Sequence, residues 1–557
     1  MRSLRCERQP LSCDKSFLGA RFCSGWSLCV LQAIFFLLSL PFLGSFLAAQ
    51  TDTTGADVAV EDASQTETAT ELSEVAASEP FDPIKENGEF FVGWEKPDLA
   101  LVLTGLLDGY IEPCGCAGMD RMKGGLSRRA DFLKSLRDQG WPVMAIDAGL
   151  ITSGYGFQEE LKFDMAINAF YLMGYSAIGI SPNELRFPAH YLLKYTVPPG
   201  PDEESLFVSA NIGVYGFLRL YTLPYKVIEQ NGIRIGVTSV VDPTSISALD
   251  DKIKTRHPDE RLNALLTELR NEDCDHWILI AHGSEEFVNG LVADFRDFDV
   301  IITGDSPTTP PLEPKRTENG QFIIEVGEKG KYAVVLGIYG DSVRYQRVAL
   351  DSRYNQSGDV HLLMKEYQDV LNGIVEANGF EGLNIMPVES PERQVKGDYI
   401  GAAKCGSCHS DAYDIWRDSR HSTSWKSLSS DPPTEHTANP PRVSDPDCVS
   451  CHVVGWNGPA HVPYLTGYAD MKATPHLANV GCESCHGPGS NHATAELGSD
   501  SELQTRLRDA IRVGDNVKQI CFSCHDDDNS PSFEFEEYYQ QIDHTLPEDD
   551  EDEEDDE

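Results

Sequence analysis

Four copies of a Cys-x-x-Cys-His motif lie in the last third of the chain. Two thiols three positions apart form thioethers with the vinyl groups of a porphyrin, and the adjacent imidazole then ligates the iron. A pair of zinc ribbons also uses Cys-x-x-Cys knuckles, but zinc does not require a histidine after the second cysteine in every copy. The motifs therefore predict four covalently attached c-type haems. The cysteines are Cys405, Cys408, Cys448, Cys451, Cys482, Cys485, Cys521 and Cys524, and the expected proximal iron ligands are His409, His452, His486 and His525.

The opposite face of each haem iron needs a separate ligand. A second histidine makes the iron six-coordinate and suited to electron transfer, whereas an open sixth position permits substrate chemistry. Six further histidines follow residue 399. We expect the distal ligands among His421, His492, His544 and His476, with His461 and His436 as the remaining candidates.

A second pair of thiols, Cys114 and Cys116, lies far from the haem motifs and follows Glu112 and Pro113. Two thiols in Cys-x-Cys chelate a soft metal, form a disulfide or act as a redox pair. Two inert thiols in a turn are the alternative. The position at the end of an apolar run, 99–107, favours a functional pair.

The charge of the chain restricts its partners. There are 89 acidic and 45 basic residues, for a formal net charge of −44. A phosphate backbone would be repelled, so nucleic-acid binding is excluded, and basic redox proteins are the expected partners.

The N-terminus has the pattern of an export sequence. Five basic residues precede an apolar run at 29–47, and small residues follow it. This predicts export to the periplasm or to the outer face of the inner membrane. Cleavage of a signal peptide and retention of a membrane anchor both remain open.

The remaining chain divides by composition into five parts after the export segment, 1–50. Residues 51–93 read as a disordered acidic linker. Alternating strand and helix patterns over 94–355 predict an α/β domain, including a hairpin across 230–232. Residues 356–398 read as a helical connector, 399–545 as a small, mainly helical and loop-rich tetrahaem domain, and 546–557 as an acidic disordered tail.

The haem region resembles the cytochrome c-554-type tetrahaem family. The resemblance rests on the order of the motifs, on the string Gly-Cys-Glu-Ser-Cys-His-Gly-Pro-Gly at 481–489 with His492 after it, and on Trp416 before His421. It implies closely stacked haems that pass electrons between partners. It also implies that His421 serves the third haem and His492 the fourth. The second haem can be five-coordinate in that family, although His544 or His461 offers a ligand here.

The α/β region resembles the metallophosphoesterase domain of exported 5′-nucleotidases, over the stretches 104–113, 124–129, 146–149, 209–211, 280–283 and 301–306. The resemblance implies a β-sandwich flanked by helices and a site for two metal ions. The positions of the metal ligands align with Leu106, Asp108, Leu150, 181–184 and 304–307, and only His282 clearly survives. Because leucine cannot ligate a metal, we expect this site to be lost. The Pro-Cys-Gly-Cys sequence at 113–116 follows the first strand, where the metal site begins in that family.

Three functions follow from these observations. The first is an exported tetrahaem cytochrome that transfers electrons and carries a non-hydrolytic phosphoesterase-like docking or redox module. The second is a haem oxidoreductase that acts on a small substrate at a five-coordinate iron. The third is a metal-dependent phosphoesterase or nucleotidase tethered to a cytochrome.

Overall fold

The computed structural model describes residues 81–114, 119–198, 200, 204–356, 358–429 and 440–545, and all of them fall in one structural unit. The export segment, most of the expected linker, Cys116, His436 and the acidic tail lie outside the described residues. In the part that is described, no helix is both long and apolar enough to cross a bilayer.

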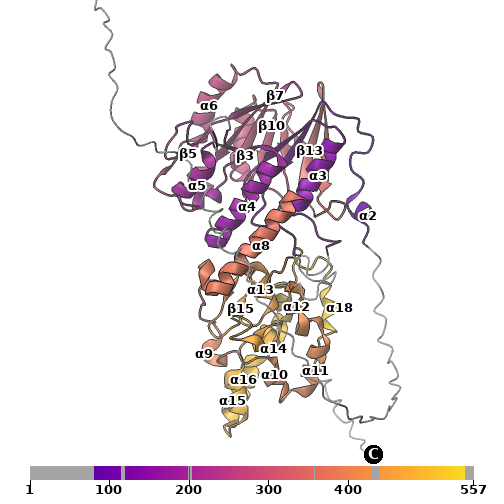
Figure 1. Cartoon of the computed structure of the whole chain (residues 1–557), viewed down its shortest axis with the longest axis vertical. Coiled ribbons are helices and arrows are strands. Elements are labelled where there is room, and N and C mark those ends of the chain that lie inside the picture. The colour runs from indigo at the N-terminus through magenta and orange to yellow at the C-terminus, as the bar shows by residue number, and fades with distance from the viewer. Residues whose placement is uncertain are drawn as a thin grey trace, which may run out of the picture. The chain divides into compact units, whose positions relative to one another are not determined.

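Two six-stranded sheets form the centre of the α/β part (Figure 1). The first has the order β14 (Ser342–Ala349), β13 (Tyr332–Tyr339), β1 (Leu99–Thr104), β2 (Val143–Asp147), β3 (Tyr175–Gly179) and β4 (Phe207–Val208). The second has the order β11 (Lys315–Arg316), β12 (Phe322–Ile324), β10 (Val300–Thr303), β9 (His276–His282), β7 (Ile233–Val241) and β6 (Lys226–Gln230). In the first sheet β1 to β4 are parallel, and β13 pairs antiparallel with both β1 and β14. In the second sheet the four inner strands are parallel, and the edge strands β11 and β6 are antiparallel to their neighbours. This arrangement is that of an α/β domain, as expected.

The two sheets pack face to face because alternate side chains of each strand point to opposite faces. In β1, Leu101 and Leu103 join Val237 and Ile280 of the second sheet in one buried cluster. The intervening Val102 belongs to a different cluster with helices on the outer face. The core is therefore continuous through both sheets.

Helices cover the outer faces of the sandwich. The helices α3 (Leu126–Asp138), α4 (Phe157–Met173) and α8 (Asp359–Asn378) cover the first sheet, and α6 (Pro258–Leu269) and α7 (Glu285–Asp294) cover the second (Figure 1). Helix α8 was expected as a connector, and it is helical. It also buries Met364, Tyr367 and Leu371 against the sandwich, so it is an integral part of the outer layer.

The smaller elements of this part are α2 (Pro83–Asn87), η1 (Glu184–Arg186), α5 (Ala189–Thr196), η2 (Pro243–Ser245) and the paired strands β5 (Ile212–Val214) and β8 (Ile253–Thr255). The hairpin expected at 230–232 is confirmed: Gln230 pairs with Ile233, and Asn231 and Gly232 both have positive φ. This is the turn that Asn-Gly favours.

The last residues of the expected linker, from residue 81 onwards, are folded against the α/β part. Asp82 caps α2, and the Asn87 amide donates to Asp351 at 2.8 Å. The Phe91 ring stacks on Phe132 and meets Trp141 edge-on. Because these aromatic rings bury apolar area on the sandwich, the ordered chain begins before residue 94.

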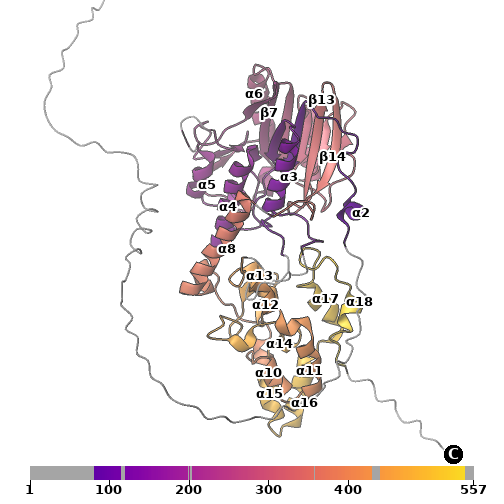
Figure 2. The same cartoon turned by 45° about the vertical axis from the view of Figure 1, so that its right-hand side comes forward.

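The C-terminal region consists of short helices, coloured orange to yellow in Figure 2. They are η3 (Phe380–Leu383), α9 (Arg393–Lys396), α10 (Ala402–Gly406), α11 (Ser410–Asp418), η4 (Arg420–Thr423), α12 (Trp425–Leu428), α13 (Pro446–His452), η5 (Pro475–Leu477), α14 (Cys482–His486), α15 (Ser490–Glu496), α16 (Ser501–Ile511), η6 (Gly514–Asn516), α17 (Val517–Phe522) and α18 (Phe535–Tyr539). One two-stranded ribbon joins β15 (Trp456–Asn457) to β16 (Val462–Pro463). The region is mainly helical and rich in loops, as expected.

Candidate functional site

Each Cys-x-x-Cys-His motif lies in or next to a single helical turn. In the first motif the backbone N–H groups of Cys408 and His409 both donate to the carbonyl of Cys405, at 3.1 and 3.0 Å. The fourth motif repeats this around the carbonyl of Cys521, at 3.2 and 2.9 Å. The second and third motifs lie in α13 and α14. One turn of helix brings residues three and four apart to the same face, which is the geometry that thioether attachment needs.

Three motif histidines face a second imidazole from elsewhere in the chain. The ring centres of His409 and His492 are 6.2 Å apart. His421 lies 6.1 Å from His525, and His486 lies 5.9 Å from His544. Two imidazoles that share one metal have ring centres about 6.2 Å apart, from a metal–nitrogen bond of about 2.0 Å and about 1.1 Å to the ring centre on each side. The spacing of all three pairs therefore fits an iron between the rings.

Hydrogen bonds at the Nδ1 atoms orient three of the motif histidines. His452 Nδ1 lies 2.8 Å from the Ser424 carbonyl, and His486 Nδ1 lies 2.9 Å from the Ile511 carbonyl. His525 Nδ1 lies 3.0 Å from Ser530 Oγ. A carbonyl accepts a hydrogen bond, so Nδ1 of the first two carries the proton and Nε2 keeps its lone pair for a metal.

The second motif differs from the other three. Among the described residues, the His452 ring faces no second imidazole at the spacing of the three pairs. His461, a remaining candidate ligand, instead has its Nδ1 3.0 Å from Asp447 Oδ1. That hydrogen bond, with the carboxylate charge, raises the pKa of His461 despite partial burial of the ring. Raising the pKa favours the protonated imidazole, which is not a metal ligand.

The distal pairing differs from the one that the family resemblance implied. His421 was assigned to the third haem and faces the fourth motif; His492 was assigned to the fourth haem and faces the first motif. The third motif faces His544. His476, the remaining expected ligand, is exposed in η5 and contacts Gly401. The ring spacings therefore favour a different pairing, because position relative to a motif in the sequence does not determine which motif a loop crosses.

The thiols of different motifs lie next to each other. A hydrogen bond from the Cys482 thiol, together with burial, raises the pKa of Cys405, and Cys524 acts in the same way on Cys451. The first motif therefore adjoins the third, and the second adjoins the fourth. A cavity of about 270 Å³ is lined by Cys451, Cys485 and Cys524, so the second, third and fourth motifs share one space.

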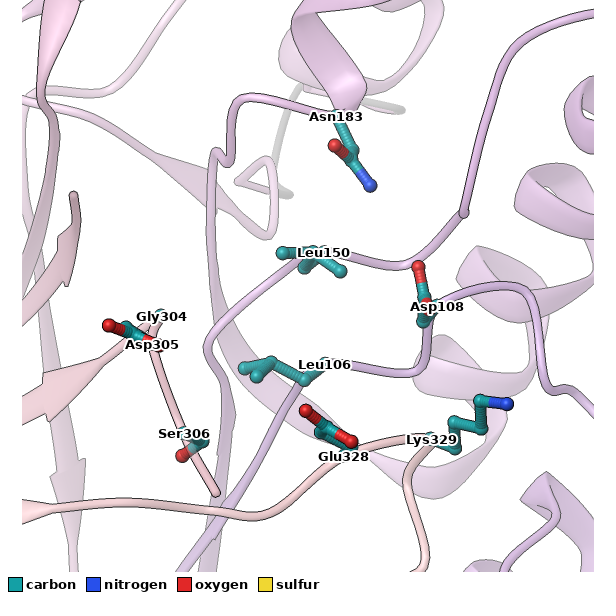
Figure 3. A pocket seen from close by; sticks show the side chains of 9 residues that line it. All are labelled: Leu106, Asp108, Leu150, Asn183, Gly304, Asp305, Ser306, Glu328 and Lys329. Atoms are coloured by element: carbon teal, nitrogen blue, oxygen red, sulfur yellow. The ribbon is translucent and has the colours of Figure 1, made fainter. Parts of the chain in front are cut away.

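A pocket of about 310 Å³ opens in the α/β part at the ends of its inner strands (Figure 3). Its lining contains Leu106, Asp108 and Leu150, and at least one residue from each of the stretches 181–184 and 304–307 that align with metal ligands. The lining residues are Leu106, Asp108, Leu150, Asn183, Gly304, Asp305, Ser306, Glu328 and Lys329. The family resemblance thus pointed to most of the residues that the tertiary structure brings together in this pocket.

At two positions of this pocket the backbone has a conformation that leucine, the residue present, rarely adopts. Leu106 and Leu150 have φ of 51° and 59°, a region that non-glycine residues rarely adopt and that Asp and Asn tolerate better. The leucine side chains project into the pocket between the polar residues (Figure 3). Within the described residues, no group of three or more His, Cys, Asp or Glu side chains is arranged to hold a metal ion.

His282, the surviving family residue, packs behind the pocket. It is 2% exposed, and its Nε2 lies 2.6 Å from the Ala148 carbonyl. Burial lowers the pKa of His282 to about 4, so the ring is neutral at pH 7 and donates from Nε2. Gly304 lies against the ring with no room for a Cβ. This histidine therefore stabilises the strand ends.

Ion pairs join the α/β part to the haem motifs. Lys162 of α4 lies 2.7 Å from Asp447, the residue before Cys448. Lys329 and Lys331 both pair with Asp528, which follows the fourth motif. Sequence reasoning missed these pairs, because nothing in the sequence marks which of the chain's 89 acidic residues meets a lysine.

The Cys114 loop also touches the haem region. Cys114 is disulfide-bonded, whereas the other described cysteines are free thiols; Cys116 lies outside the described residues. Arg442, six residues before Cys448, donates from Nη1 to the Pro113 carbonyl at 3.0 Å. Two regions that looked unrelated in the sequence are therefore in contact.

Comparison with known proteins agrees with this two-part architecture. Residues 404–487 match the family described as cytochrome c554 and c-prime, a span that includes the first three motifs. Cytochrome c-554 of Nitrosomonas europaea is 31% identical over 146 residues, covering 23% of this chain and 57% of that protein. The C-terminal part is therefore similar to c-type cytochromes, whose haem is covalently bound.

The α/β part is similar to 5′-nucleotidases. A snake venom 5′-nucleotidase of Gloydius brevicauda is 25% identical over 278 residues, covering 46% of each chain. The crystal structure of a 5′-nucleotidase precursor from Thermus thermophilus aligns with a TM-score of 0.43 and 15% identity, covering 59% of this chain and 68% of that one. The two sheets and this sequence similarity show a metallophosphoesterase-like α/β fold. The chain spans 57% and 46% of the two curated relatives.

Proposed function

We propose that this protein is an exported tetrahaem c-type cytochrome that transfers electrons. The observation that carries the proposal is the set of three imidazole pairs with ring centres 5.9–6.2 Å apart. Paired imidazoles close both axial positions of an iron, which leaves no place for a substrate and favours outer-sphere electron transfer. Four motifs supply four attachment points, hence four haems.

The contacts between motifs support an order for the electron path. The first motif adjoins the third through Cys405 and Cys482, and the fourth adjoins the second through Cys524 and Cys451. The shared cavity brings Cys485 of the third motif together with Cys524 of the fourth. These contacts support a chain of haems in the order first, third, fourth, second.

In this proposal the α/β part is a docking or redox module without hydrolytic activity. Leu106 and Leu150 offer no lone pair to a metal, and Lys162, Lys331 and Arg442 anchor the module beside the second and fourth motifs. The module would therefore affect electron transfer at the fourth and second haems, which form one end of the proposed chain.

The net charge of −44 supports a basic redox protein as the partner. The apolar run at 29–47 supports export to the periplasm, with or without attachment to the membrane. Haem ligation, partner and location remain parts of one proposal.

A second candidate function is chemistry on a small substrate at the second haem. It is favoured by one observation, that His452 faces no imidazole partner among the described residues while His461 is engaged by Asp447. The first and second functions differ only in what happens at this haem.

Electron paramagnetic resonance during a redox titration of the full-length holoprotein tests the proposal. We expect three low-spin haems with paired histidine ligands. Addition of nitric oxide to the ferrous protein then reports on the second haem, and binding at one haem only would support the second function. High-spin signals from three or four haems would contradict electron transfer through paired ligands.

A further inference from the structure

The loop that carries Cys114 is held against the second haem motif by one arginine. Arg442 Nη1 lies 3.0 Å from the Pro113 carbonyl and 3.4 Å from the Cys114 carbonyl. Its Nη2 lies 3.0 Å from Glu112 Oε2. The same guanidinium interacts electrostatically with Cys448, a thioether-forming cysteine of the second motif, which follows Arg442 by six residues. A single planar group therefore connects the Cys114 backbone with the attachment point of the second haem.

This connection is buried. The Arg442 side chain is 13% exposed and that of Glu112 is 7% exposed. Burying a charge is costly unless it is paired and hydrogen-bonded, and here the carboxylate and two carbonyls fulfil that requirement. On its other side the loop packs on α3, where the Leu126 N–H donates to the Ile111 carbonyl at 2.9 Å. The loop is thus held between Arg442 and the start of α3.

The second motif also adjoins a second electron acceptor. Cys451 lies beside Cys524 of the fourth motif, so the attachment points of two haems adjoin each other. A disulfide exchanges two electrons, whereas each haem iron exchanges one. A neighbouring pair of haems matches the electron count of one disulfide.

We propose that the disulfide of Cys114 is a redox centre that exchanges electrons with the second and fourth haems. When its two thiols are oxidised, the S–S bond forms, two protons go to solvent, and two electrons pass to two ferric haems, which become ferrous. The reverse reaction takes two electrons and two protons and breaks the S–S bond. Arg442 is a positioning residue that holds the loop at the second motif. The inference rests on the proposed electron-transfer function.

The test uses the full-length ferric holoprotein and dithiothreitol, a dithiol that reduces exposed disulfides by exchange. Haem reduction is followed by absorbance after rapid mixing. We expect the rate for the first two haem equivalents to fall at least tenfold in Cys114→Ser. Cys274→Ser is the matched control, because Cys274 is a free thiol in the α/β part, remote in sequence from the haem motifs, and its variant should react like the wild type.

A second measurement reports on the thiol itself. Alkylation of Cys114 by iodoacetamide, measured by mass spectrometry, should be low in the ferric protein and high in the ferrous protein. In Arg442→Lys, which keeps the charge but loses the planar fork, alkylation should lag behind haem reduction. If Cys114→Ser fails to fold, wild-type protein with its thiols reduced and alkylated replaces it in the rapid-mixing experiment.

Equal rates with dithiothreitol in the wild type and Cys114→Ser would overturn the inference, as would alkylation that is the same in ferric and ferrous protein. Ascorbate, which donates electrons to haem without thiol exchange, separates the two proposals. Normal reduction by ascorbate, together with dithiothreitol rates that do not depend on Cys114, leaves the electron-transfer function intact and removes only the disulfide relay. Failure of ascorbate to reduce any haem would contradict the proposed function itself.

Discussion

The imidazole of His421, in η4, lies 6.1 Å from that of His525 in the fourth haem motif. Burial lowers the pKa of His421 below its usual range, and burial together with the neighbouring His421 lowers the pKa of His525 to about 4. Both rings are therefore neutral at pH 7, and neutral imidazole is the form that ligates iron. A segment that follows the first motif thus completes the site of the last one.

Removal of the His421 side chain should open one axial position. In His421→Ala we expect one low-spin haem signal to be replaced by a high-spin signal, since an iron with a single histidine ligand is five-coordinate or takes up water. Electron paramagnetic resonance of the ferric protein measures this change. His476→Ala is the control, because His476 is exposed and faces no motif histidine; a high-spin signal in that variant would contradict the pairing described above.

The buried His282 should make stability depend on pH. Its pKa is about 4 in the folded chain, because burial disfavours the charged ring, and about 6.5 when unfolded. As pH falls below about 6.5 the unfolded state binds a proton that the folded state does not, so stability is lost towards pH 4. The contribution is on the order of 2–3 kcal/mol.

Thermal unfolding from pH 7 to pH 4 in wild type and His282→Asn measures this contribution. Asparagine still donates a hydrogen bond towards Ala148 but does not titrate. The difference in unfolding free energy between the two proteins should shrink as pH falls. A difference that stays constant over this range would show that the ring is protonated in the folded chain.

Lys162 should be important for joining the two parts of the chain. Its side chain is 5% exposed and lies 3.0 Å from Glu159 and 2.7 Å from Asp447. Lys162→Ala leaves both carboxylates without this partner. Because Asp447 remains 35% exposed, we expect the free energy of unfolding to fall by about 1–3 kcal/mol.

The exposed pair of Lys134 and Asp138 provides the control. Lys134→Ala should unfold like the wild type, because exposed ion pairs add little to stability. Chemical denaturation followed by circular dichroism measures the free energy of unfolding of each variant. Equal losses of this free energy in Lys162→Ala and Lys134→Ala would refute the role of the Lys162 contact.

The pocket of the α/β part should not hydrolyse phosphate esters. Leu106 and Leu150 stand where a two-metal site needs ligands, and hydrolysis by this route requires two metal ions that activate water. We expect no turnover of a nucleoside monophosphate or of p-nitrophenyl phosphate with added Mn²⁺. Turnover by the wild type that disappears in Asp108→Asn would establish the phosphoesterase as the correct function.

Much of the fold was predictable, because it depends on local patterns. The apolar run at β1 and the Asn231–Gly232 turn have short-range causes, and both occur as expected. The start of the ordered chain was not predictable from composition. Phe91 lies in an acidic segment, and only its contacts with the rings of Phe132 and Trp141 show that it packs on the sandwich.

The sequence by itself indicated where haem would be attached and at which positions of the α/β part the metal ligands of the resembled family are missing. Thioether formation depends on two thiols and a histidine within five residues, so a local motif is sufficient, and a leucine excludes metal ligation wherever it lies. Only the tertiary structure decided which distal histidine faces which motif, and that Arg442 links the Cys114 loop to Cys448. These contacts join residues far apart in the chain, and their partners are selected by how the helices and loops pack rather than by spacing in the sequence.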